Sequence, residues 1–247
     1  GLDCTVTAPS FLDFVPGRDD AALLGADAAC LARLGTGGCG YEQQFEATLK
    51  ALTPASSDLR FFDETVGHGD GVNAGFLRPD SLLVVLFLTD ENDCSVSDSE
   101  LLDRTSARFT PDLNLRCFRH PGAVHPVDPY VEGLLRLRED PSTLLVVSLV
   151  GIPPEIPPDA SFESILEHAG MEERISDEAP TQLAFACTDP EHLAFPSRRF
   201  VELAQGLESG GANAVVRSIC QDDFQEPRLA ISAAARRILR TGRCTEE

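Results

Sequence analysis

Three short apolar runs, separated by stretches with helical spacing, constrain the fold of this chain most. The runs are SLLVVLFLTD (81–90), STLLVVSLVG (142–151) and NAVVRSIC (213–220). They are rich in Val, Leu and Ile and carry almost no charge, which is typical of strands in a parallel sheet. The run at 81–90 is apolar on both of its faces, so we expect it at the buried centre of the sheet.

Helical spacing fills the intervals between these runs. We expect one helix from Asp19 to Leu34 and others at about 41–52, 98–107, 129–139, 161–170, 196–208 and 226–241. In the last of these, the pattern predicts that Leu229, Ala233 and Ile238 face inward. Strands that alternate with helices specify an α/β fold with a doubly wound, mostly parallel sheet and helices on both of its faces.

The rest of the chain fits one domain that spans residues 1–247. The first twenty residues contain two short candidate strands, broken by Pro9 and Pro16. Residues 53–80 are rich in Pro, Ser, Asp and Gly, and we interpret them as a loop excursion.

Charge and hydropathy exclude two classes of partner. The 247 residues include 20 Lys and Arg against 40 Asp and Glu, for a net charge of −20. A basic surface is required for sequence-independent binding of phosphate backbones, so nucleic acid is not expected as a partner. The longest apolar run is LLVVLFL (82–88), far short of the 18 residues or so that predict a membrane-spanning helix.

The cysteines favour an oxidising compartment. Their number is even, none forms a CxxC pair of the kind found in structural zinc sites, and they are spread over the chain as Cys4, Cys30, Cys39, Cys94, Cys117, Cys187, Cys220 and Cys244. Eight cysteines allow 105 complete pairings, among which the sequence does not choose. The chain starts at Gly1 without a basic-then-apolar leader, which indicates a processed product.

The loop after the first apolar run gathers acidic side chains. Thr89-Asp90-Glu91-Asn92-Asp93 follows the strand directly, and ligands of open α/β sheets bind beyond the carboxyl ends of strands. Oxygen ligands alone suit Ca²⁺, Mg²⁺ or Mn²⁺. The alternative is that Asp90 caps the next turn and that the other acids are solvated.

Other motifs in the chain carry less weight. Residues 90–100 lack the glycine and the final glutamate of an EF-hand loop. Residues 93–97 match the formula D-x-S-x-S of metal-ion-dependent adhesion sites, but that aspartate should end the strand, where Asp90 stands instead. Catalytic patterns such as GxSxG, the P-loop and HExxH are absent, and we expect the pairs His68 with Asp70 and His120 with His125 to be surface residues.

Three segments resemble one known family. LGTGGCGYEQQFEATLKAL (34–52), GFLRPDSLLVVLFLTDENDCS (75–95) and RSIC (217–220) are similar to secreted or lipid-anchored bacterial proteins with a von Willebrand factor A-like domain. The resemblance implies a Rossmann-like sheet whose top face binds a divalent cation and, through it, an acidic partner. It also implies a first strand before residue 1, so the sheet of this chain lacks that strand. Either an upstream segment or another chain would complete it.

The resemblance also implies a set of metal ligands. Asp90 takes the place of the aspartate that ends the fourth strand of the family, and Asp93 lies in the same loop. Thr36 stands a few residues before the position where the family has a ligand threonine, which Gly40 occupies here, and Glu42 could supply an oxygen instead. Ca²⁺ and Mg²⁺ are the expected cations, and the expected partner is a protein or cell-surface ligand.

Two disulfides and three functional hypotheses follow from this interpretation. We expect Cys187 to pair with Cys220 and Cys94 with Cys117, which leaves Cys4, Cys30, Cys39 and Cys244 as further candidates. The first hypothesis is a non-enzymatic, extracytoplasmic binding or adhesion module, assisted by a cation. The second is a structural surface protein with a vestigial ion site. The third is a metal-dependent hydrolase, which would need a histidine within reach of the acids at 90–93.

Overall fold

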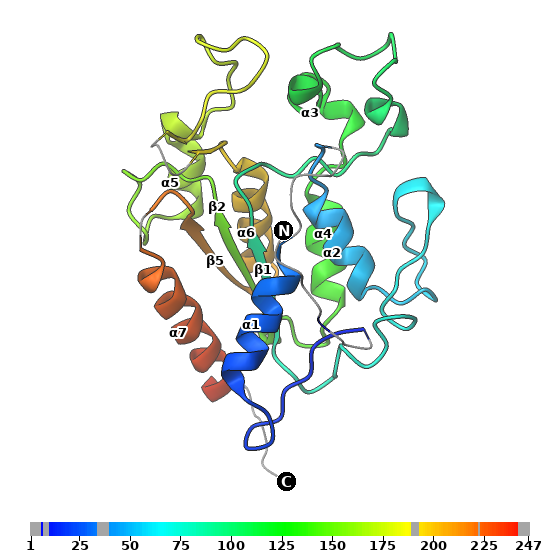
Figure 1. Cartoon of the computed structure of the whole chain (residues 1–247), viewed down its shortest axis with the longest axis vertical. Coiled ribbons are helices and arrows are strands. Elements are labelled where there is room, and N and C mark those ends of the chain that lie inside the picture. The colour runs from blue at the N-terminus through cyan, green and yellow to red at the C-terminus, as the bar shows by residue number, and fades with distance from the viewer. Residues whose placement is uncertain (1–5, 7–9, 34–39, 189–192, 222, 242–247) are drawn as a thin grey trace.

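A parallel sheet of three strands lies in the middle of the molecule (Figure 1). The computed structural model describes residues 6, 10–33, 40–188, 193–221 and 223–241. The strands are β1 (Leu83–Leu88), β2 (Leu144–Val150) and β5 (Asn213–Ser218), in the order β1-β2-β5. A separate antiparallel pair is formed by β3 (Cys187–Thr188) and β4 (Leu193–Ala194). The three strands lie in the three predicted runs, so the α/β class with a parallel sheet is confirmed.

The expectation that the run at 81–90 occupies the centre of the sheet is wrong. β2 is the central strand, and all of its seven residues are buried. β1 is an edge strand in which buried and exposed residues alternate. Leu83, Val85 and Phe87 point into the core, whereas Val84, Leu86 and Leu88 are exposed to solvent.

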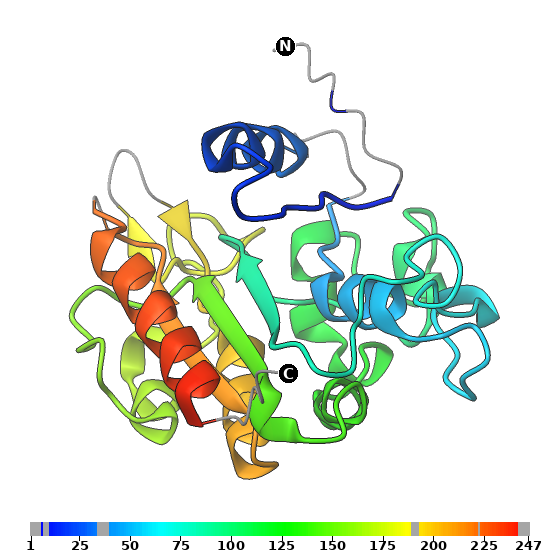
Figure 2. The same ribbon diagram turned by 90° about the horizontal axis from the view of Figure 1, so that it is seen from below.

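Helices cover both faces of the sheet. They are α1 (Ala21–Leu31), α2 (Gln44–Leu52), α3 (Arg116–Arg119), α4 (Asp128–Arg136), α5 (Phe162–Glu167), α6 (Arg198–Ser209) and α7 (Gln225–Thr241). On one face, apolar residues of α2, α4, α5 and α6 form the main core with alternate residues of the strands. On the other face, α7 packs through Ile238 and its neighbours on Leu145 and Val147 of β2. α1 stands in front of β1, and none of its residues is buried (Figures 1 and 2).

Most of the predicted helices exist, with two differences. The stretch at 98–107 forms only a short 3₁₀ turn (Ser99–Leu102), which Asp98 caps, and then a loop, because the Asp103 carboxylate accepts from the N–H of Thr105, which a helix would use. In α7, Ile238 is buried as expected, but Leu229 and Ala233 are exposed. Among the described residues, α7 packs mainly on β2 and β5 through Ile238, Ile231, Ala234 and Ala235, so the buried side of the helix is narrower than its apolar pattern suggests.

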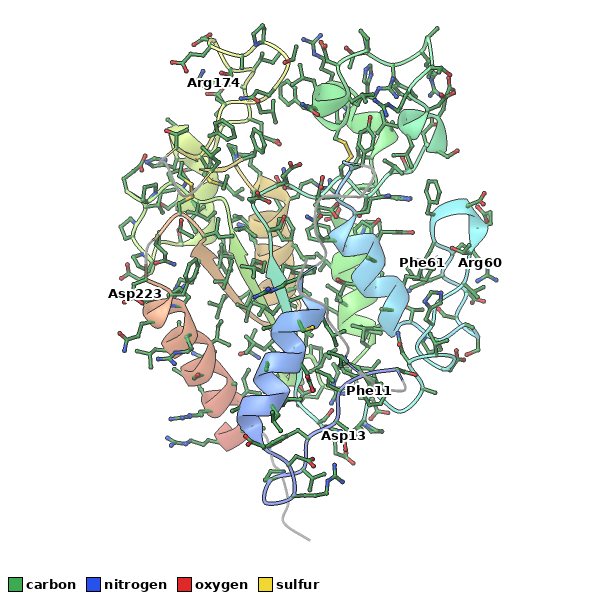
Figure 3. The ribbon with its side chains drawn as sticks, viewed as in Figure 1. Phe11, Asp13, Arg60, Phe61, Arg174 and Asp223 are labelled. Carbon is green, nitrogen blue, oxygen red and sulfur yellow. A yellow bond between two sulfur atoms is a disulfide. The ribbon has the colours of Figure 1, made fainter. Side chains whose placement is uncertain are left out.

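The excursion at 53–80 contains no strand and only one short 3₁₀ turn (Phe62–Glu64). Gly67 and Gly69 hold it against the end of α2, where an added Cβ would meet the carbonyl oxygens of Thr53 and Leu52 at 2.0 and 2.3 Å. Only glycine allows such a close approach of two backbones. Phe61, labelled in Figure 3, belongs to the excursion and is buried in the main core.

Both expected disulfides are confirmed. Cys94 is bonded to Cys117 and Cys187 to Cys220. Cys30 is also disulfide-bonded. Cys4, Cys39 and Cys244 lie outside the described residues, as do most of the first ten residues, where one of the two candidate strands was expected. Among the described helices, none combines the length and apolar character needed to cross a bilayer.

Candidate functional site

The acidic loop lies at the carboxyl end of β1. Thr89 still bonds to β2 through its N–H, which donates to the Leu149 oxygen (3.2 Å), and the chain then turns away from the sheet. The Thr89 hydroxyl accepts from the N–H of Glu91 (3.2 Å), and the backbone carbonyl oxygen of Asp90 accepts from the N–H of Phe195 (2.8 Å). Two excursions, residues 99–123 and residues 172–186, project from this same end of the molecule (Figure 1). Arg174, labelled in Figure 3, lies on the second of them.

Glu42 joins this loop from the segment that leads into α2. The N–H of Cys94 donates to the backbone carbonyl oxygen of Glu42 at 2.6 Å, which fixes the segment beside the loop. The Gln44 side-chain amide donates to the Thr89 hydroxyl (3.1 Å), and its oxygen is buried without a hydrogen-bond partner. The structure therefore brings together two elements that the sequence separates by almost fifty residues.

The Glu42 and Glu91 carboxyl groups are hydrogen-bonded to each other. Burial raises the pKa of Glu91 to about 7, and the negative charges of Glu42 and, less strongly, Asp90 add to this effect. No described arginine, lysine or histidine forms an ion pair with any of these three carboxylates. We call Glu42, Asp90 and Glu91 the acidic edge.

Asp93 does not belong to the acidic edge, because its carboxylate already has partners. The Asp93 side chain is fully buried and accepts from the N–H of Phe45 (2.9 Å), which lies in the first turn of α2. It also accepts from the N–H and hydroxyl of Ser95 (3.0 and 2.8 Å) and from the guanidinium of Arg199 (3.1 Å). The Ser95 hydroxyl in turn accepts from the N–H of Glu46 (3.1 Å). Asp93 and Ser95 of the D-x-S-x-S formula therefore tie α2 and α6 to the loop.

The metal centre that the resemblance implies stays a prediction. None of the described Asp, Glu, His and Cys side chains form a group of three placed to hold one ion. Thr36 lies outside the described residues. The carboxylates that could contact a cation are those of the acidic edge, in which Glu42 and Glu91 share a hydrogen bond.

The histidines that the structure describes serve other contacts. His120 accepts from the N–H of Thr110 (3.1 Å), and His168 accepts from the N–H of Gly170 (3.1 Å). The His125 ring lies edge-on to Tyr130, and the backbone of His68 is bonded to Lys50. The pairs His68 with Asp70 and His120 with His125 form no metal group in the described part of the chain.

Two side chains that position the site were missed in the sequence. Arg199 links Asp93 to the His125 carbonyl oxygen (2.9 Å), and Gln44 contacts Thr89. Gln44 lies in the GCGYEQQ segment that the resemblance already singled out, so the sequence offered a signal for it. Nothing near Arg199 in the sequence signals its role, because its partner Asp93 is 106 residues away.

Comparisons of the chain with protein-family models, with curated proteins and with solved structures find no match. The resemblance to von Willebrand factor A-like domains therefore rests on the three sequence segments alone.

Proposed function

We propose that this chain is a non-enzymatic binding module of an extracytoplasmic protein and that the acidic edge is its binding surface. The observation that carries the proposal is the contact between the Glu42 and Glu91 carboxyl groups at the carboxyl end of the sheet, without a basic side chain paired to them among the described residues. Two carboxyl groups in contact are an unfavourable arrangement unless a proton or a cation lies between them.

Three features support the binding role over a catalytic one. The edge stands where open α/β sheets receive their ligands. Among the described residues no histidine forms an ion pair with the acidic edge, and the rings of His120, His125 and His168 contact Thr110, Tyr130 and Gly170 instead. The disulfides Cys94–Cys117 and Cys187–Cys220 suit an oxidising compartment, which supports a secreted, periplasmic or cell-surface location.

A divalent cation is the ligand that this surface fits best. Once deprotonated, Glu42 and Glu91 offer oxygens to Ca²⁺ or Mg²⁺, and Asp90 stands in the same loop. With so few ligands from the protein, the cation keeps coordination positions for an acidic group of a protein or cell-surface partner. The cation itself should bind weakly, with a Kd on the order of 10⁻⁴–10⁻³ M.

Calorimetric titration with CaCl₂ and with MgCl₂ at pH 8 and pH 5.5 tests the proposal. We expect binding at pH 8 that weakens at pH 5.5, where Glu91 holds a proton. Asp90→Asn and Glu42→Gln should each weaken it, whereas Glu139→Gln, a substitution of an exposed glutamate after α4, should not. Absence of binding at pH 8, or equal binding by all variants, refutes the cation-assisted module and favours a structural surface protein.

A further inference from the structure

The outer edge of β1 has no strand partner among the described residues. The N–H of Thr89 points to β2, and backbone groups of a strand alternate in direction, so Leu83, Val85 and Phe87 also bond to β2. The N–H and C=O groups of Val84, Leu86 and Leu88 therefore point away from the sheet.

The same three residues expose their side chains. Val84, Leu86 and Leu88 are 42%, 54% and 61% exposed, and they lie on the face of the sheet that α7 covers over β2 and β5 but not over β1. A strand with unpaired backbone groups and exposed apolar side chains is a template for another strand.

This edge also lacks the features that normally prevent strand pairing. Soluble proteins protect edge strands with charges, prolines or bulges. β1 contains neither a charged residue nor a proline, and its pairing with β2 is regular over all six residues. β5, at the opposite edge of the sheet, carries Arg217 in its second half, paired with Glu226.

We propose that β1 pairs with β1 of a second copy of this chain, antiparallel and across a twofold axis at Leu86. In this register Val84 faces Leu88 of the second copy, Leu86 faces Leu86, and Leu88 faces Val84. These are the residues whose backbone groups point outward, and an antiparallel pair of such residues exchanges both of its N–H···O bonds. The edge is therefore complementary to itself, as a twofold interface requires.

The pairing also brings apolar side chains together. Directly opposed side chains of an antiparallel pair lie on the same face, so Val84, Leu86 and Leu88 of the two copies form one continuous patch. The first acidic residues beyond the strand on either side are Asp80 and Asp90. In this register they face Asn92 and Leu82 of the second copy, so no two carboxylates are directly opposed.

Sedimentation velocity over a concentration series of the full chain tests the dimer. We expect the wild-type chain to dimerise and Leu86→Lys to raise the dimer Kd by at least ~10-fold, because the substitution places two like charges opposite each other at the axis. Leu229→Lys is the matched control, because Leu229 is an equally exposed leucine (58%) on α7. Circular dichroism checks that both variants fold.

Amide hydrogen exchange supplies an independent measurement. In the dimer, the N–H groups of Val84, Leu86 and Leu88 should be protected as strongly as those of Val85 and Phe87, and Leu86→Lys should remove that protection selectively. A monomer at all concentrations overturns the proposal. So does a dimer that Leu86→Lys leaves intact, or protection of these amides in a monomer, which would mean that a segment of the same chain, such as α1, covers the edge.

Discussion

The substitution Glu91→Gln should stabilise the protein at neutral and alkaline pH. The folded protein raises the pKa of Glu91 from 4.5 to about 7, by burial and by the charge of Glu42. Between these two values the folded state therefore binds a proton that the unfolded state has lost. The free energy of unfolding must fall as the pH rises through this window, and above about pH 7 the full penalty remains. Glutamine keeps the shape and the hydrogen bond to Glu42 without the charge.

The size of the effect follows from the pKa. Each pH unit corresponds to about 1.4 kcal/mol, so a fully buried group would give about 3 kcal/mol. Glu91 is partly exposed, and solvent screens its charge, so we expect Glu91→Gln to gain about 1–2 kcal/mol at pH 8. At pH 4.5 or below the gain should vanish, because the wild-type glutamate is then protonated in the folded state.

Urea unfolding of the wild type and Glu91→Gln between pH 4 and pH 8.5 measures this difference. Acids elsewhere in the chain titrate alike in the two proteins, so their contributions cancel. Glu139→Gln, at an exposed position, should run parallel to the wild type at every pH. A constant difference between Glu91→Gln and the wild type across the range would refute the reasoning. CaCl₂ should narrow the gap at pH 8 if the acidic edge binds the cation.

Three further substitutions test the framework around the site, each by urea unfolding. Asp93→Asn should cost about 3–5 kcal/mol, because Arg199 loses its buried counter-charge, and amide exchange should increase at Phe45 in the first turn of α2. Arg116→Met should lower the free energy of unfolding by about 3 kcal/mol or more, because the guanidinium is fully buried and bonds to carbonyl groups of the excursion at 99–123. A decrease of under about 1 kcal/mol would contradict this. Replacing Cys94 and Cys117 together by serine should cost about 3 kcal/mol from the loop of 23 residues, and an unchanged midpoint would argue against the bridge.

The sequence predicted those parts of the fold that depend on local pattern. α2 buries Phe45, Leu49 and Leu52 as its spacing requires, and the three strands fall within the three apolar runs. In such segments the burial of one face follows from the period of the apolar residues alone, so a single window of sequence contains the necessary information.

The structure around the site depends on contacts between distant segments, which no window contains. Within the excursion, Arg116 bonds to the carbonyl groups of Thr110, Asp103 and Leu101, which lie 6, 13 and 15 residues earlier, and apolar periodicity at 98–107 carries no information on these contacts. Asp90 and Asp93 looked equivalent as acids of one loop. They differ only in their tertiary contacts. Asp93 bonds to Arg199 and to the N-terminus of α2 and is therefore a structural residue, whereas Asp90 is exposed.

The position of β1 at the edge could not be read from its composition, and the reason bears on its role. LLVVLFL at the edge and LLVVSLV at the centre are nearly the same run, yet it is the central strand that carries a polar residue, Ser148, which is buried there. A continuous apolar run is typical of a strand that is buried on both faces of a sheet, and β1 has such a sequence. In the described structure only one of its faces is covered. Leaving Val84, Leu86 and Leu88 exposed costs hydrophobic free energy that polar residues would have avoided. The composition of β1 is thus a second reason, independent of backbone geometry, to test whether a further polypeptide segment contacts this strand.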